Sequence, residues 1–208
     1  MNLIELFLRG GIVMYPLLIA SILTLVIVME RSFFWYMVLK RQEPVVKKIL
    51  ALYREDWEQA RQRLELDMDL SIVRIFWSAL SLDNPTPEEF RLALEAGLHG
   101  EIPLLKRFQN LLDTIITLSP LLGLLGTVTG LMTSFANIQV GEITGEKASA
   151  VSGGISEALI TTATGLSIAI FAALFANIFR GLYQRQLAFM QEYTTQLELY
   201  FYRYHAPH

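Results

Sequence analysis

Three long uncharged, apolar runs alternate with charged segments along this chain. The runs cover residues 10–29, 114–141 and 158–179, and each reaches the roughly 20 residues that a helix needs to cross a bilayer. Because lipid offers the backbone no hydrogen-bond partners, runs of this length predict helices. The pattern predicts an all-α membrane protein with three transmembrane helices.

The polar segments between the runs define the remaining parts of the chain. The first run is too long for the apolar region of a signal peptide and lacks a small-residue cleavage site, so it is expected to stay as a span. In chain order we predict an outer segment, a span, a cytoplasmic helical domain, a span, an outer loop, a span and a cytoplasmic C-terminal helix, at residues 1–11, 12–36, 37–109, 110–136, 137–152, 153–180 and 181–208.

The distribution of basic residues predicts the orientation of the spans. Most lysines and arginines lie between the first two spans, whereas the loop between the second and third spans has only Lys147. Basic residues accumulate on the cytoplasmic side of membrane proteins. The chain is therefore expected to have its N-terminus outside and its C-terminus inside.

The charged segment after the first span has the sequence signals of helices. Thr86 is a suitable N-cap, Pro87 suits the first helical position, and Glu89 completes a capping box. We predict a break or bend at Pro103, after which a helix continues into the second span. The charges of this segment are expected to form a solvated face. The tail is expected to be amphipathic, with its apolar face at Leu182, Phe189, Tyr193, Leu197 and Tyr200.

Small residues recur along the second and third spans. In membranes such residues let helices approach closely. The sequence predicts close helix packing at four glycines: Gly123, Gly126, Gly130 and Gly165.

Glu157 introduces an ionisable group into the last apolar stretch. Such residues are costly in lipid and normally face a bundle interior or a water-filled path. Thr162 lies roughly 7–8 Å further along the helix, and its hydroxyl could line such a path, as could those of Thr127, Thr161 and Thr164. Threonines in membrane helices also bond back to carbonyls of their own helix, and that alternative stays open for each of them.

These spans resemble the MotA/TolQ/ExbB channel subunits of bacterial energy-transducing motors. The resemblance covers nearly the whole chain and is strongest in the stretches 119–128 and 154–166. The length and the three spans are similar to TolQ or ExbB. The resemblance implies that Thr127, Glu157 and Thr162 line a pore and that Pro120 lies at a bend near it.

The resemblance also implies an assembly in the bacterial inner membrane. The expected complex is a homopentamer around two single-span helices of an ExbD- or TolR-like partner, which supplies the ion-carrying aspartate. The three spans lack an aspartate apart from Asp113 at one edge, as expected for a chain that needs this partner. Ion flow would then energise a TonB- or TolA-like protein.

The transported ion is expected to be a proton, with sodium as the alternative. Protons follow from the resemblance, since members of this size are mostly proton-driven. Thr161 and Thr164 stand where such members often have alanine and isoleucine, and threonine oxygens suit a hard cation such as sodium. In the sodium case Thr127, Thr161 and Thr162 would be its ligands.

Other classes of protein have less support in the sequence. The three histidines lie outside the spans and no Gly-x-Ser-x-Gly motif occurs, so no enzyme is expected. The stretch 141–149 has the wrong spacing for a phosphate-binding loop, and no cofactor is expected. A net charge of −3 does not indicate nucleic acid binding, and the chain has no cysteine. A passive membrane scaffold is the remaining alternative.

Overall fold

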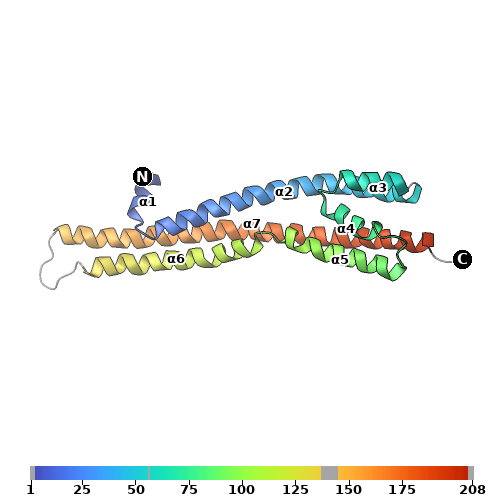
Figure 1. Ribbon diagram of the computed structural model, residues 1–208. Helices are drawn as coiled ribbons and strands as arrows, with labels where there is room; N and C mark the ends of the chain where they lie inside the picture. Colours follow the sequence, from blue (N-terminus) through green and yellow to red (C-terminus); the bar gives the residue numbers. More distant parts are fainter. Residues whose placement is uncertain (1–2, 56, 137–144, 206–208) are drawn as a thin grey trace. The chain divides into compact units, whose positions relative to one another are not determined.

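The computed structural model describes residues 3–55, 57–136 and 145–205, which form helices and short connections (Figure 1). Three helical stretches, Met14–Glu55, Pro87–Ala136 and Val151–Arg203, are long and apolar enough to cross a membrane. This confirms the prediction of an all-α membrane protein with three spans. The helices are α1 (Leu3–Arg9), α2 (Met14–Glu55), α3 (Trp57–Leu66), α4 (Ser71–Leu80), α5 (Pro87–Leu105), α6 (Gln109–Ala136) and α7 (Gly145–His205).

The chain divides into two compact units. The first, here called the span unit, contains the described residues of 1–30 and 108–178, and the second, the charged unit, contains those of 31–107 and 179–208. The predicted outer loop, residues 137–152, lies in part outside the described residues. Its remainder is helical, because α7 already begins at Gly145.

Within the span unit, α6 and α7 lie side by side and antiparallel (Figure 1). Gly130 packs on Ala158 near one end of the contact, and Gly123 packs on Thr162 further along. A small cluster of buried residues, Val13, Met14 and Leu17, joins the start of α2 to this pair through Leu122, Ile160 and Ile168. The absence of large side chains along the α6–α7 contact lets the two backbones approach closely.

The core of the charged unit is built mainly by α4 and α5. One face of α4 is buried almost completely, and its largest fully buried side chains are Ile72, Ile75 and Phe76. Phe90 of α5 stacks on Phe201 of α7, with ring centroids 4.0 Å apart and an angle of 6° between the planes. Burial of these aromatic and aliphatic side chains is the main stabilising contribution available to this unit.

The start of α5 has the predicted capping box. The Thr86 hydroxyl accepts a hydrogen bond from the Glu89 amide at 3.2 Å, and the Glu89 carboxylate accepts one from the Thr86 amide at 2.8 Å. The hydrogen bond from the Thr86 amide, followed by that from its hydroxyl, lowers the pKa of Glu89 from its ordinary value. Pro87 occupies the first turn, as its fixed backbone favours.

The break that was predicted at Pro103 lies two residues later in the structure, and the alternative of a bend at Pro103 stays a prediction. Helix α5 continues through Pro103 and ends at Leu105, and Phe108, with φ of 66°, separates it from α6. The Arg31 guanidinium donates a hydrogen bond to the Leu105 carbonyl at 2.6 Å, which satisfies one of the backbone acceptors left open at a helix end. A left-handed residue, Phe108, and the hydrogen bond from Arg31 thus mark the end of α5.

The prediction that the charges of the segment after the first span form a solvated face is wrong for two of them, because Asp67 and Glu101 are buried. Both Glu101 oxygens accept hydrogen bonds from Arg74, at 2.7 and 2.5 Å. These bonds raise the pKa of Arg74 above its ordinary value against the opposing effect of burial. A fork of two parallel bonds is the strongest arrangement for this pair, and here it links α4 to α5.

The C-terminal part of α7 buries a different face from the predicted one. Leu197 is buried as expected, but the other buried residues of this part are Gln186, Met190 and Phe201. Leu182, Phe189, Tyr193 and Tyr200 are only half-buried. The buried face of this part of α7 is therefore displaced by about one residue from the face that the sequence predicts.

Candidate functional site

The four predicted packing glycines all lie in the contact between α6 and α7. A Cβ atom added to Gly123 would lie 3.0 Å from the Thr162 Cα, and one added to Gly130 would lie 2.6 Å from the Gly154 carbonyl oxygen. A Cβ on Gly126 would collide with the side chain of Thr161. Gly165 faces the other helix in the same way, against the Ser119 carbonyl. We call these contacts the glycine seam.

Thr161 lies inside the glycine seam. Its side chain is fully buried, at 0% exposure, and packs against Gly126. Its hydroxyl donates within α7, toward the carbonyls of Glu157 at 3.1 Å and Ala158 at 3.0 Å. Within this single chain its oxygen is thus enclosed by protein.

Thr162 is half-buried and forms a hydrogen bond between helices. Its hydroxyl donates to the Gly123 carbonyl of α6 at 3.2 Å. The hydroxyls of Thr127 and Thr164 instead bond to carbonyls of their own helices, at 2.6 and 2.8 Å. Bonding within a helix is the common behaviour of threonine in membrane spans.

Thr127 of α6 lies level with residues 157–162 of α7, but on a different side of α6 from the glycine seam. Its neighbour Gly126 is opposite Thr161, and Gly130, about one turn after Gly126, is opposite Ala158. The half-buried Thr127 side chain points out of the glycine seam. The structure therefore places Thr127 level with the stretch 157–162, but without a hydrogen bond to it.

Pro120 lies within α6, which continues through it. Proline has no amide hydrogen, so the Ile116 carbonyl loses its usual helical partner at this point. The residue before it, Ser119, is fully buried, and its hydroxyl has no hydrogen-bond partner among the described residues. The predicted bend at Pro120 stays a prediction.

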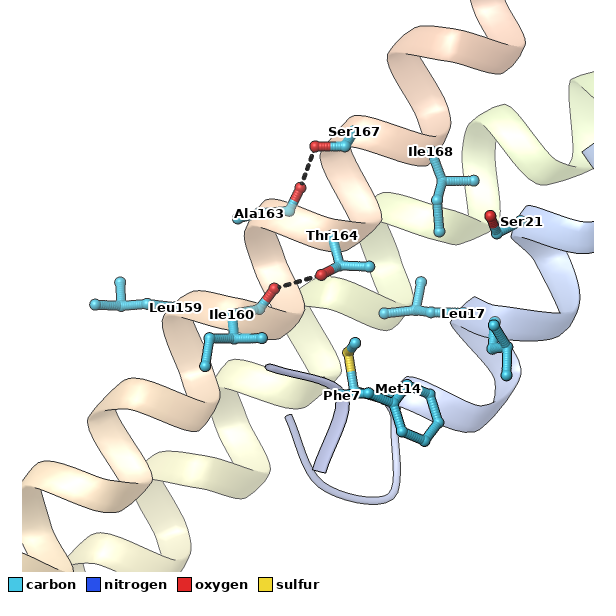
Figure 2. A pocket seen from close by; sticks show the side chains of 11 residues that line it. Phe7, Met14, Leu17, Ser21, Leu159, Ile160, Ala163, Thr164, Ser167 and Ile168 are labelled. Carbon is cyan, nitrogen blue, oxygen red and sulfur yellow. Dashed lines mark hydrogen bonds between the residues drawn. The ribbon is translucent and has the colours of Figure 1, made fainter. Parts of the chain in front are cut away.

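Thr164 lines an apolar pocket between α1, α2 and α7. The pocket has a volume of about 510 Å³, and Figure 2 shows the Thr164 hydroxyl bonded to the Ile160 carbonyl beside it, and that of Ser167 bonded to Ala163. Phe7, Met14 and Leu17 form the opposite side. Thr164 thus lies on the side of α7 that faces α2, whereas Thr161 faces α6.

Glu157 lies against the turn between α1 and α2. Its carboxyl group packs on Gly11, so that a Cβ atom there would lie 2.7 Å from the Glu157 Cδ. Gly11 belongs to the first residues of the apolar run 10–29, so the carboxyl group is level with the end of that run and not with its middle. Among the described residues, no ion pair or hydrogen bond involves the Glu157 carboxyl group.

Sequence reasoning missed the contribution of Gly10 and Gly11 to this site. The pair lies in the turn between α1 and α2, and Gly11 has φ of +66°, a conformation that residues with a Cβ atom rarely adopt. Adjacent glycines at the start of an apolar run are a turn signal that the sequence already contains. Their contact with Glu157 joins residues far apart in the sequence and has no such signal.

The chain matches known proteins over most of its length. The model of the MotA/TolQ/ExbB proton channel family matches residues 55–192. A putative biopolymer transport protein ExbB-like 3 from Synechocystis is 52% identical, over 94% of this chain and 93% of the relative, and ExbB-like 1 from the same organism is 42% identical, over 100% and 82%. The biopolymer transport protein ExbB of Salmonella typhimurium is 41% identical, over 43% of this chain and 35% of the relative. Family model and relatives agree, and this multi-pass membrane protein belongs to the MotA/TolQ/ExbB proton channel family.

Proposed function

We propose that this chain is the channel subunit of an inner-membrane motor, in which Glu157, Thr162 and Thr127 line a path for ions. The observation that carries the proposal is the Glu157 carboxyl group, which has no charged or hydrogen-bonding partner among the described residues. Such a group next to lipid needs water, an ion path or a partner from another chain. The level shared by Thr127 and the stretch 157–162 supports a path at this height.

The proposed assembly supplies what the single chain lacks. A homopentamer would place five Glu157 side chains around a common axis, and an ExbD- or TolR-like partner would bring the aspartate that carries the ion. Membership of this family and the similarity to ExbB relatives support a multi-subunit membrane complex. The N-terminus would lie in the periplasm, the charged unit in the cytoplasm, and the energised protein would be of the TonB or TolA type.

Protons are the better-supported ion. The sodium alternative depends on threonine oxygens as ligands, and Thr161, which would add one of them, is enclosed between α6 and α7 with 0% exposure. A proton path needs no cage of oxygens, because a carboxylate and ordered water suffice. The pathway roles of Thr161 and Thr164 stay predictions, since Thr161 is enclosed against Gly126 and Thr164 lines the apolar pocket toward α2.

The experiment measures ion flux in proteoliposomes that contain this chain and its co-purified single-span partner. Glu157→Gln and Thr162→Val are expected to lower the flux about tenfold or more, which corresponds to about 1.4 kcal/mol at the limiting barrier. Thr129→Val is the matched control for Thr162, because the Thr129 hydroxyl bonds only to carbonyls of its own helix. Glu5→Gln, at an exposed glutamate of α1, is the control for loss of a carboxylate.

Two outcomes would contradict the proposal. Unchanged flux in both test variants, with normal assembly, would leave a passive membrane scaffold as the better account, since the glycine seam needs no ion. Flux that disappears when sodium is removed would replace protons by sodium in the same pathway. Full flux without sodium is the result that we expect.

A further inference from the structure

The turn between α1 and α2 is built on two glycines with different surroundings. The Gly10 amide donates to the Phe7 carbonyl at 3.2 Å, and the Met14 amide donates to the Gly11 carbonyl at 3.2 Å. A Cβ atom on Gly10 would meet the flexible Met14 side chain, whereas one on Gly11 would meet Glu157. Of these two glycines, only Gly11 has a positive φ.

The Glu157 carboxyl group occupies the space that a side chain at residue 11 would need. An added Cβ atom would collide with Oε1, lie 2.7 Å from Cδ and lie 3.5 Å from Cγ. The overlap thus involves the carboxyl end of Glu157 and not its aliphatic stem. Real Cβ atoms do not come this close to a neighbour, so any other residue at position 11 would displace the carboxyl group.

This contact restricts a side chain that is otherwise free to turn. Glutamate has three rotatable bonds, and among the described residues its carboxyl group here has no hydrogen bond to orient it. The Gly11 backbone limits the carboxyl group on the side of the α1–α2 turn. In an ion path that depends on the Glu157 carboxyl group, the orientation of this group determines which groups of the path it can contact.

We propose that Gly11 is a positioning residue for Glu157, and that the α1–α2 turn seats the carboxyl group for its part in ion transfer. This inference rests on the proposed function of Glu157. The competing explanation is that Gly11 serves only the turn, through its positive φ. The two explanations differ in whether the effect of a substitution at residue 11 depends on the side chain at residue 157.

A double-mutant cycle separates these explanations, with ion flux measured in proteoliposomes of the complete complex. The variants are Gly11→Ala, Glu157→Asp and the two combined. Aspartate is one methylene shorter, so its carboxyl group withdraws from residue 11 and leaves room for the added Cβ atom. We expect Gly11→Ala to lower the flux about tenfold in the presence of Glu157 and about twofold or less in the presence of aspartate, a coupling typical of residues in contact.

The control cycle uses Gly10→Ala with Glu157→Asp. Gly10 lies in the same turn but faces Met14, so its effect is expected to be the same with either acid at residue 157. If Gly11→Ala prevents assembly, Gly11→Asn replaces it, because asparagine tolerates a positive φ and still places a Cβ atom against the carboxyl group. The same coupling is expected from it.

Independent effects of Gly11 and Glu157 in the cycle, or full flux in Gly11→Ala, would overturn the positioning role. Either result, together with a loss of flux in Glu157→Gln, would leave the proposed function intact. Full flux in Glu157→Gln would instead contradict the proposed function itself. The failure of one proposal is thus distinguishable from the failure of the other.

Discussion

Gly165 of α7 offers the sharpest test of how the glycine seam holds α6 and α7 together. The perturbation is Gly165→Ala, which adds one methyl group. That group would collide with the Ser119 carbonyl oxygen and would lie 3.2 Å from the Gly123 Cα. Both neighbours belong to the backbone of α6, so neither can rotate away, and the two helices have to separate.

The magnitude follows from two opposing effects. Replacing a helical glycine by alanine stabilises a helix by about 1 kcal/mol. Overpacking a tight contact costs about 1–3 kcal/mol, and backbone neighbours favour the upper part of that range. We therefore expect Gly165→Ala to destabilise the chain by about 1–2 kcal/mol net.

Gly181→Ala is the matched control on the same helix. A Cβ atom on Gly181 meets no atom within 4 Å, so this variant keeps the gain in helix propensity without the clash. We expect it to be more stable than the natural chain by about 0.5–1 kcal/mol. The two chemically identical substitutions should differ by about 1.5–3 kcal/mol.

The assay is thermal unfolding of the full chain in a mild detergent, followed by far-UV circular dichroism. A difference of this size corresponds to about 3–12 °C in Tm for a chain of this length. A Gly165→Ala variant as stable as Gly181→Ala would refute the reasoning. It would mean that the seam is loose enough to accept a methyl group.

Two further predictions concern the charged unit. Arg74→Met should lower the free energy of unfolding by about 3 kcal/mol, because it leaves the Glu101 carboxylate, in a residue 8% exposed, without its two hydrogen bonds. Chemical denaturation measures this loss, and a loss no larger than that of Arg91→Met, whose ion pairs are exposed, would contradict it. Thr86→Ala should increase hydrogen exchange in the first turn of α5 at neutral pH. The hydrogen bond from the Thr86 amide, which this variant keeps, and the bond from the Thr86 hydroxyl, which it removes, both lower the pKa of Glu89. The contribution of the hydroxyl bond is therefore present above the ordinary pKa of 4.5 and disappears as the pH falls through the lower value in the folded chain. The effect of Thr86→Ala should therefore shrink at acid pH, and an effect that is the same at both pH values would count against this explanation.

Local signals in the sequence were sufficient for the spans and for the start of α5. A span depends on the length and continuity of an apolar run, both of which are properties of neighbouring residues. The capping box at Thr86 likewise needs only residues within one turn. These features could be predicted because their energetics do not depend on distant parts of the chain.

The break between α5 and α6 shows where local signals fail. Pro103 is a strong local signal, yet α5 passes through it and ends after Leu105, where Arg31 binds the last carbonyl. The cost of a proline within a helix can be offset by tertiary packing, and the turns of α5 before Pro103 contact α4 at Gly97 and Glu101. The burial of Glu101 beside Arg74 likewise depends on a contact between residues far apart in the sequence.

The sequence by itself determined that this chain crosses a membrane, that small residues gather in its second and third spans, and that Glu157 and several threonines interrupt the apolar pattern. Only the tertiary structure decided which side of α7 each of these side chains faces. It enclosed Thr161 against α6, directed Thr164 toward α2, and placed the Glu157 carboxyl group on Gly11. The reason is geometric: successive residues of a helix point about 100° apart, and which of these directions meets protein is fixed by neighbouring helices.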